Sequence, residues 1–211
     1  MKKYILLDWD GTLAKTLDIW LDACRYAINE QGVSKSDEEI SSSFGQFPQF
    51  LRKWGVKNVQ LAIEDADKIA KKKLPNVELY PDALFVLEEL KKTSKTLALI
   101  TTSPLENIEQ LLVKYELMST FDVIIHGDDV KNHKPHPESL ELALRKLSGT
   151  KEEAIMIGDS DKDVGASTNA GIDSILFYPP EHRKFYDIDT VRQLKPTFVI
   201  SDFKDIIQLV G

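Results

Sequence analysis

The sequence lacks the features that mark several classes of protein. It has one cysteine, Cys24, which excludes an internal disulfide and a zinc site built from cysteines. No apolar run approaches the roughly 18 residues that a membrane-spanning helix needs. Lysine and arginine number 27 against 34 aspartates and glutamates, a net charge of −7, so no basic field draws the chain to nucleic acid or anionic lipid. We therefore expect a cytoplasmic protein without a nucleic-acid or membrane partner.

The composition is that of an ordinary folded protein, and the pattern of the chain favours an α/β fold. Apolar residues make up 42% and charged residues 29%, and 211 residues permit one large domain or a domain with an insertion. Short apolar strands alternate with helices over residues 81–211, which predicts a doubly wound parallel sheet with helices on both faces. Strands are expected at residues 4–7, 96–100, 121–125, 154–157, 174–177 and 198–200.

Residues 15–80 have a different pattern. Apolar residues recur at helical spacing and no strand signal occurs between Leu13 and Tyr80, which predicts an all-helical domain. Residues 1–14 and 81–211 would then form the α/β core into which this domain is inserted. The stretch 178–196 combines prolines, mixed charges and aromatics, and is expected to be a surface excursion.

The first predicted strand leads directly into a pair of carboxylates. Tyr4–Leu7 is continuously apolar and is followed by Asp8-Trp9-Asp10-Gly11-Thr12, where the glycine ends the strand. In extended chain the side chains of Asp8 and Asp10 would point to the same side. Two close carboxylates repel each other unless a cation lies between them, and oxygen ligands favour Mg²⁺. The alternative is that Asp8 caps a turn which Asp10 begins.

Polar residues also follow the later strands. In an open parallel sheet, ligands bind beyond the carboxyl ends of the strands, near the point where the strand order reverses. We therefore expect one shared site at this edge of the sheet. Its candidate residues are Asp8, Asp10, Thr101, Thr102, Asp128, Asp129, Asp159 and Asp163.

Four ordered motifs resemble those of the haloacid dehalogenase superfamily. They are Asp8-Trp-Asp10-Gly-Thr12, then Thr101 after an apolar strand, then Lys134-Pro135, then Gly158-Asp159-Ser160-x-x-Asp163. The resemblance covers nearly the whole chain, including a helical cap between the first and second motifs. Within the superfamily, the chain is similar to the phosphoglycolate phosphatases. The resemblance implies a Rossmann-like core and phosphoryl transfer.

The resemblance implies a role for each motif carboxylate. Asp8 would be the nucleophile that forms an aspartyl-phosphate, and Asp10 the general acid and then the general base. The metal ligands would be Asp8, the backbone carbonyl of Asp10, and Asp159, with water completing the shell of Mg²⁺. Asp163 would hold a metal-bound water.

The other two motifs would bind the phosphoryl group. The hydroxyl of Thr101 and the backbone amide of Thr102 would hold its oxygens. Lys134 would supply positive charge to the transition state.

Residues outside the motifs are weaker candidates. On the predicted cap, Gln46 and Arg52 are expected as substrate contacts, whereas Trp20 is expected to pack in the cap core. His133 stands where related phosphatases commonly have glycine, and is interpreted as a surface histidine beside a turn.

The expected function is a Mg²⁺-dependent phosphatase of a small phosphorylated metabolite, acting as a monomer or a homodimer. An acidic residue at Asp10 favours phosphate esters over haloacids and phosphonates. One alternative is a phosphomutase similar to β-phosphoglucomutase, which shares the aspartyl-phosphate. The other is a non-catalytic binding protein, which should have lost a motif carboxylate, and none is lost.

Overall fold

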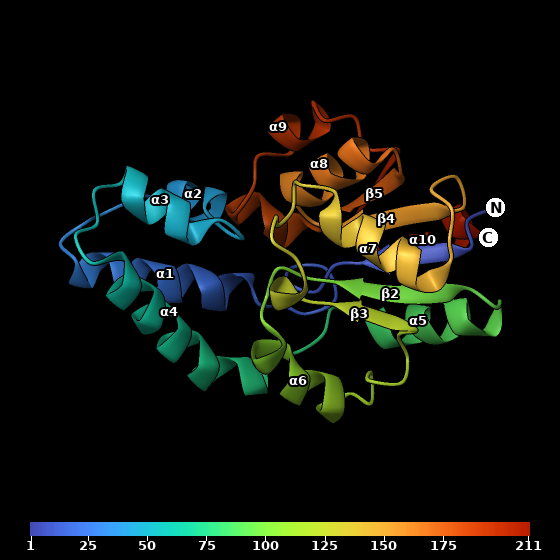
Figure 1. Cartoon of the computed structure of the whole chain (residues 1–211), viewed down its shortest axis with the longest axis horizontal. Helices are drawn as coiled ribbons and strands as arrows, with labels where there is room; N and C mark the ends of the chain where they lie inside the picture. The colour runs from blue at the N-terminus through green and yellow to red at the C-terminus, as the bar shows by residue number, and fades with distance from the viewer.

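A computed structural model describes all 211 residues and contains one six-stranded sheet (Figure 1). The strand order is β3-β2-β1-β4-β5-β6, and every neighbouring pair is parallel. The predicted doubly wound parallel sheet is therefore confirmed. The strands are β1 (Tyr4–Leu7), β2 (Thr96–Ile100), β3 (Val123–Ile125), β4 (Ala154–Gly158), β5 (Asp173–Phe177) and β6 (Phe198–Ile200).

Strand β1 lies inside the sheet and is buried on both faces, which explains why its sequence is continuously apolar. Ile5 and Leu7 pack into the larger apolar core, and Tyr4 and Leu6 pack into a second core on the opposite face. Helices α5 (Ala83–Lys92), α6 (Leu105–Lys114) and α10 (Asp205–Val210) contribute to the larger core. Helices α7 (Glu138–Leu147) and α8 (Asp161–Ala170) cover the opposite face.

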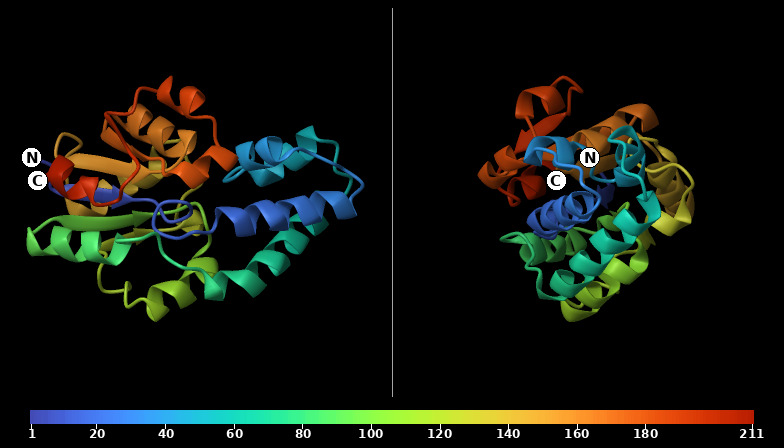
Figure 2. Two further views of the ribbon diagram at one scale, coloured as in Figure 1. Left: turned by 180° about the vertical axis from the view of Figure 1, so that it is seen from behind. Right: turned by 90° about the vertical axis from the view of Figure 1, so that its left-hand side faces the viewer.

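Four helices lie beyond the carboxyl ends of the strands, on the side of the molecule away from both termini (Figures 1 and 2). Helix α4 presents the small residues Ala62, Ala66 and Ala70 at four-residue spacing, which lets it pack closely along α1. The predicted absence of strands from this part of the chain is confirmed, and its status as a separate cap domain stays a prediction. The helices are α1 (Leu17–Glu30), α2 (Asp37–Ser42), α3 (Phe47–Lys53) and α4 (Val59–Lys73).

The two connections between these helices and the sheet run side by side. The backbone amide of Tyr80 donates to the carbonyl of Leu13, and the amide of Lys15 donates to the carbonyl of Glu78, both over 2.9 Å. These hydrogen bonds fix the position at which α1 leaves the sheet. None of the helices is long and apolar enough to span a membrane.

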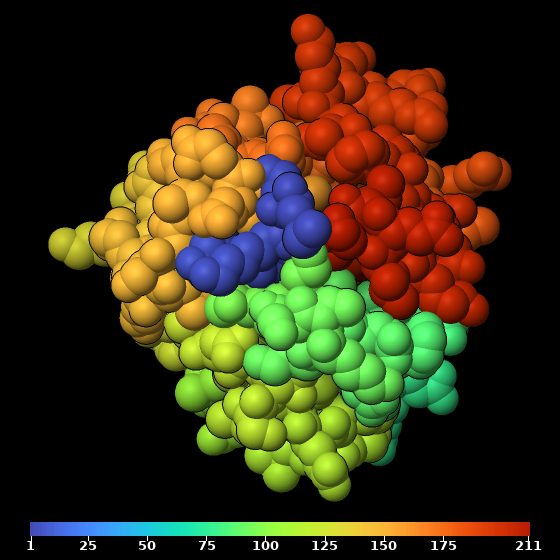
Figure 3. Space-filling view, turned by 90° about the vertical axis from the view of Figure 1, so that its right-hand side faces the viewer, coloured from blue at the N-terminus to red at the C-terminus, as the bar shows by residue number.

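The amino ends of the strands form the opposite face of the molecule. Figure 3 shows the N-terminal residues there, between the C-terminal segment and the residues near 150. Lys95 is buried, and its ammonium donates to the carbonyls of Lys2 and Val210 over 2.7 and 2.5 Å. Since buried carbonyls need donors, this lysine fastens both ends of the chain to β2.

The expectation of a surface excursion at residues 178–196 is confirmed only in part, because most of the segment is exposed but a few of its side chains are buried. This segment forms a 3₁₀ turn at Pro180–Lys184 and helix α9 (Ile188–Arg192), and it buries His182 and Phe185. The imidazole Nε2 of His182 lies 2.6 Å from the hydroxyl of Tyr80. Sequence periodicity does not reveal this burial of a polar residue. The imidazole ring lies edge-on to four aromatic rings, those of Tyr80, Phe177, Tyr178 and Tyr186.

Burial lowers the pKa of His182 to about 3, so its imidazole makes stability depend on pH. The ordinary value in an unfolded chain is about 6.5, and between these two values only the unfolded state binds the proton. The free energy of unfolding should therefore fall as pH decreases below about 6.5, by up to about 1.4 kcal/mol per pH unit from this group.

Urea unfolding of the native chain and of His182→Gln between pH 7 and pH 4.5 measures this contribution. The variant lacks the titrating group and should have the shallower dependence on pH. Equal slopes for the two proteins would contradict the assignment.

Candidate functional site

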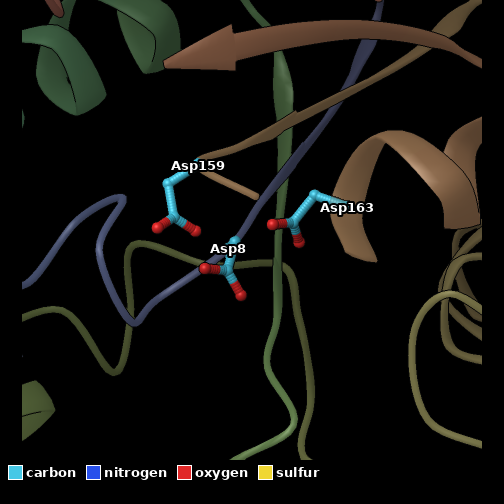
Figure 4. A group of neighbouring side chains, drawn as sticks. All are labelled: Asp8, Asp159 and Asp163. Carbon is cyan, nitrogen blue, oxygen red and sulfur yellow. The ribbon is translucent and has the colours of Figure 1, made fainter. Parts of the chain in front are cut away.

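Three carboxylates meet at the point where the strand order reverses. Asp8 follows β1, Asp159 follows the neighbouring strand β4, and Asp163 lies in the first turn of α8. Figure 4 shows their side chains converging. All three are buried, and one oxygen from each lies within 4.8 Å of the others. The strands on either side of the reversal therefore deliver these acids to one place, as expected for a doubly wound sheet.

Lys134 lies between two of these carboxylates. Its Nζ is 2.5 Å from Asp8 Oδ1 and 2.6 Å from Asp163 Oδ1, and it also donates to the carbonyl of Ile100 over 3.1 Å. Burial disfavours the ammonium, but the carboxylates of Asp163 and Asp8 more than offset this and raise its pKa. Lys134 therefore remains a cation, and with all three acids ionised the cluster carries 1 − 3 = −2.

Two of the three acids, Asp8 and Asp159, have raised pKa values. Burial raises the pKa of Asp8 to about 7 although Lys134 acts in the opposite direction. Burial, reinforced by Asp163 and Asp8, raises the pKa of Asp159 well above its usual range. Strong shifts from burial and from like charges are typical of functional sites.

The donor set fits a hard divalent cation. Asp159 Oδ2 is buried without a hydrogen-bond partner, which is unusual for a carboxylate oxygen. Gly11 has a φ of +79°, and a Cβ at this position would collide with the Asp159 carboxylate. The chain therefore leaves Asp159 in a narrow cradle of oxygen atoms, the kind of ligand that Mg²⁺ prefers.

Asp163 is already fully engaged. Its Oδ1 faces Lys134, and its Oδ2 accepts from the backbone amide and the hydroxyl of Ser160 over 3.2 and 2.7 Å. This arrangement caps the N-terminus of α8. A Cβ at Gly158 would overlap the Asp163 side chain. Asp163 thus fixes the position of Lys134, and its contact with a metal-bound water stays a prediction.

The carboxylate of Asp10 has a separate set of donors. Oδ1 accepts from the hydroxyl of Thr16 over 2.7 Å and from the indole Nε1 of Trp20 over 2.9 Å. Oδ2 accepts from the hydroxyl of Ser103 over 2.7 Å, with the hydroxyl of Thr101 at 3.4 Å. Asp10 is therefore held between α1 and the loop after β2.

Three of these donors were not predicted as site residues. Thr16 and Ser103 carry no motif, and Trp20 was expected only to pack; it does pack, but its indole also donates to Asp10. A half-buried indole needs an acceptor, yet the sequence does not say which. Asp128 and Asp129 lie instead beside His126, at 3.4 Å each, outside the carboxylate cluster.

The predicted phosphate-binding residues lie at the end of β2. Thr101 is buried, and its hydroxyl accepts from the backbone amide of Ser103 over 3.0 Å. Thr102 lines a cavity above the carboxylates, and a Cβ at Gly127 would collide with its carbonyl. The loop is therefore tightly packed, and its contact with a phosphoryl group stays a prediction.

A cavity of about 310 Å³ is lined by the carboxylates and by residues of helices α1 and α4. Tyr186 also lines it and was not predicted, because its segment was interpreted as surface. Gln46 and Arg52 do not line this cavity; they line a neighbouring polar groove, and Arg52 donates to the carbonyl of Pro48 over 3.2 Å. Their role as substrate contacts stays a prediction. His133 is exposed, as predicted, and lines both spaces.

The sequence matches one family model and is similar to named pyrophosphatases. A family model described as haloacid dehalogenase-like hydrolase matches residues 5–177. A pyrophosphatase PpaX of Bacillus mycoides is 31% identical over 217 residues, which cover 98% of this chain and 96% of that protein. A pyrophosphatase PpaX of Halalkalibacterium halodurans is 35% identical over 136 residues, 64% of this chain and 61% of that protein.

Solved structures share the fold. A protein from Bacteroides fragilis, assigned to the haloacid dehalogenase-like hydrolases, has a TM-score of 0.86 and 27% identity, and the match covers 98% of this chain and 100% of that chain. A predicted phosphoglycolate phosphatase from Haemophilus somnus has a TM-score of 0.83 and 21% identity, with coverage of 100% and 98%. The second likeness concerns the fold alone.

The carboxylate cluster predicts that Mg²⁺ stabilises the folded chain through Asp159. At a Mg²⁺ concentration about 100 times the dissociation constant, a ligand specific for the folded state adds about 2.7 kcal/mol, which raises Tm by roughly 5–10 °C for a chain of this size. Thermal unfolding of the metal-free protein with and without Mg²⁺ measures this rise.

Asp159→Asn should lose most of the Mg²⁺-dependent rise, because it removes a ligand charge. The matched control is Asp161→Asn, which alters a neighbouring acid that pairs with Lys162 outside the cluster. An equal Mg²⁺-dependent rise in both variants would show that the cation binds elsewhere.

Proposed function

The chain belongs to the haloacid dehalogenase-like hydrolase family and is a phosphatase of that family, and we propose that it hydrolyses a small phosphomonoester through an aspartyl-phosphate on Asp8, with Mg²⁺ as its cofactor. The observation that carries this proposal is the environment of Asp8, whose Oδ1 lies 2.5 Å from a buried lysine beside the unpartnered Oδ2 of Asp159. A carboxylate can attack an anionic phosphate only where positive charge offsets their repulsion. Lys134 supplies part of that charge, and Mg²⁺ held by Asp8 and Asp159 would supply the rest.

The proposed reaction has two steps. In the first, a carboxylate oxygen of Asp8 attacks phosphorus, the bond between phosphorus and the ester oxygen breaks, and Asp10 gives its proton to the departing alkoxide. In the second, water attacks the phosphorus of the aspartyl-phosphate while Asp10 takes a proton from that water. The bond between phosphorus and Asp8 breaks, which releases inorganic phosphate and restores both acids.

The chain's own residues orient the nucleophile and balance its charge. Thr12 donates its hydroxyl to Asp8 Oδ2 over 3.2 Å, while Lys134 holds Oδ1. Each oxygen of the nucleophile thus has a defined partner before the substrate enters. Mg²⁺, held by Asp8 and Asp159, would supply further positive charge beside the phosphoryl group.

The donors around Asp10 suit its two roles. The hydroxyls of Thr16 and Ser103 can donate to a carboxylate or accept from a carboxylic acid, so they can follow the change of protonation. The indole of Trp20 can only donate, so it fixes the orientation of Oδ1. Trp20 lies on α1 and Thr16 directly precedes it. The position of α1 relative to the sheet therefore determines the orientation of the Asp10 carboxylate.

The identity of the substrate is a further part of the proposal. The relatives named pyrophosphatase raise inorganic pyrophosphate as a candidate substrate. A phosphomutase similar to β-phosphoglucomutase would use the same two aspartates on a sugar phosphate. The helical wall of the cavity carries apolar residues such as Leu17, Phe44 and Ile63, which match the hydroxyls of a sugar poorly and support the phosphatase.

The nucleophile is tested by Asp8→Asn. Loss of the attacking carboxylate should lower the turnover of a generic aryl phosphate with Mg²⁺ by at least about 10³-fold, since removing a nucleophile typically has effects of this size or larger. Circular dichroism and thermal unfolding establish that the variant is folded. The matched control Asp128→Asn changes an exposed acid outside the cluster and should keep its activity. Full turnover in Asp8→Asn would refute the assignment.

The positioning role of Trp20 is tested by Trp20→Phe. The variant keeps an aromatic ring in the cavity but removes the hydrogen bond to Asp10, and a bond to a charged group contributes about 1.5–3 kcal/mol. We expect kcat to fall by about tenfold or more, with a smaller change in KM.

Trp54→Phe serves as the control, because Trp54 packs on Phe50 and does not line the cavity. Steady-state kinetics of both variants separate positioning from packing. If both lose kcat equally, Trp20 contributes only packing.

A further inference from the structure

We propose that the leaving group of the substrate is a largely apolar alcohol that carries a hydrogen-bond-donating group such as an ammonium, and not an anion. The inference rests on the proposed phosphatase function and deepens it by naming the chemistry of the ester. It follows from three features of the cavity: its apolar walls, its lack of a free cation, and two unpartnered acceptors.

The part of the cavity that faces away from the carboxylates is apolar. Helix α1 contributes Leu17, helix α4 contributes Ile63 and Ala66, and the connection between α2 and α3 contributes Phe44. Residues 63 and 66 are one helical turn apart and share a face of α4. A leaving group in contact with these side chains gains free energy by burying apolar surface, at roughly 25 cal/mol per Å².

Both lysines that line the cavity are already paired, and the imidazole Nε2 of His133 lies 3.1 Å from the carbonyl of Gly127. Lys134 lies between Asp8 and Asp163. Lys162 pairs with Asp161 over 2.9 Å and donates to the carbonyl of Ser42 over 3.2 Å. No arginine lines the cavity. A carboxylate or a second phosphate on the leaving group would therefore lose its water without gaining a partner, which is strongly unfavourable.

Two acceptors lie where α4 faces α6. Asn107 is buried in the first turn of α6, lines the cavity, and has no hydrogen-bond partner for its Oδ1. Asp67 on α4 also lines the cavity and forms no ion pair; the nearby Lys71 pairs with Glu106 of α6 over 2.8 Å instead. An orphaned buried acceptor such as Asn107 Oδ1 is rare in native structures, and the half-buried Asp67 adds a carboxylate beside it. Together they offer a site for a donor or a positive charge.

The cavity thus favours a positively charged leaving group over an anionic one. Asp67 is half-buried, and burial raises its pKa from the ordinary value although the nearby Lys71 acts in the opposite direction. A ligand ammonium would supply a cation to Asp67 and would also donate to Asn107. Inorganic pyrophosphate and phosphoglycolate, whose leaving groups are anionic, offer neither contact.

Three aryl phosphates that differ only in one para substituent test this selection. They are 4-methylphenyl, 4-(aminomethyl)phenyl and 4-(carboxymethyl)phenyl phosphate, measured with Mg²⁺ beside pyrophosphate and phosphoglycolate. We expect kcat/KM for the carboxymethyl compound to be at least about tenfold below that of the methyl compound, and the aminomethyl compound to be the best of the three. A tenfold ratio corresponds to about 1.4 kcal/mol of differential binding in the transition state.

Asp67→Asn isolates the charge that makes the selection. This variant should lower the ratio of kcat/KM for the aminomethyl over the methyl compound by about fivefold or more. Asp65→Asn is the matched control, because Asp65 lies on the same helix and does not line the cavity. It should leave that ratio unchanged.

The outcomes separate this inference from the function beneath it. Hydrolysis of the carboxymethyl compound or pyrophosphate as fast as the methyl compound, or an unchanged ratio in Asp67→Asn, overturns the inference while the phosphatase stands. No turnover of any of the five compounds overturns the proposed function, and the inference with it.

Discussion

The buried contact of Lys134 with Asp8 and Asp163 is the interaction on which the site depends. Burial and the neighbouring carboxylates raise the pKa values of Asp8 and Asp159, so both acids need positive charge nearby to stay ionised. The lysine neutralises one charge and fixes two side chains, and Ser160 fixes the far side of Asp163. What remains is an acidic pocket short of positive charge. A divalent cation would restore the balance, and it would let an anionic phosphoryl group approach Asp8.

The fold determines which of these groups could be foreseen. The sequence motifs contain all four residues of the cluster. Asp8 directly follows strand β1 and Asp159 directly follows β4, and Asp163 lies four residues further on. Parallel strands bring their carboxyl ends to one edge, which predicted the positions of Asp8 and Asp159. The same argument wrongly included Asp128 and Asp129, which lie beside His126. The place of Lys134 in the site followed from the family resemblance. The sheet and the four helices outside it could be predicted because each apolar pattern has the period of its own element.

The remaining features depend on tertiary packing that no local pattern records. Trp20 belongs to the apolar stripe of α1, yet its indole reaches Asp10 because of the angle at which α1 leaves the sheet. Ser103 lies two residues past Thr101 and is the closer donor to Asp10. Tyr186 and His182 lie in a segment without periodicity, and only the aromatic contacts with Tyr80 and Phe177 bring it into the core.

In the proposed reaction the phosphoryl group is bound covalently to Asp8 before water releases it. Rapid acid quench of the enzyme with a ³²P-labelled aryl phosphate and Mg²⁺ tests it most directly. Label should be covalently bound to a peptide that contains Asp8, released by hydroxylamine, and absent from Asp8→Asn. Turnover that proceeds with no protein-bound phosphate within the first catalytic cycle, or with the label on another residue, would contradict it.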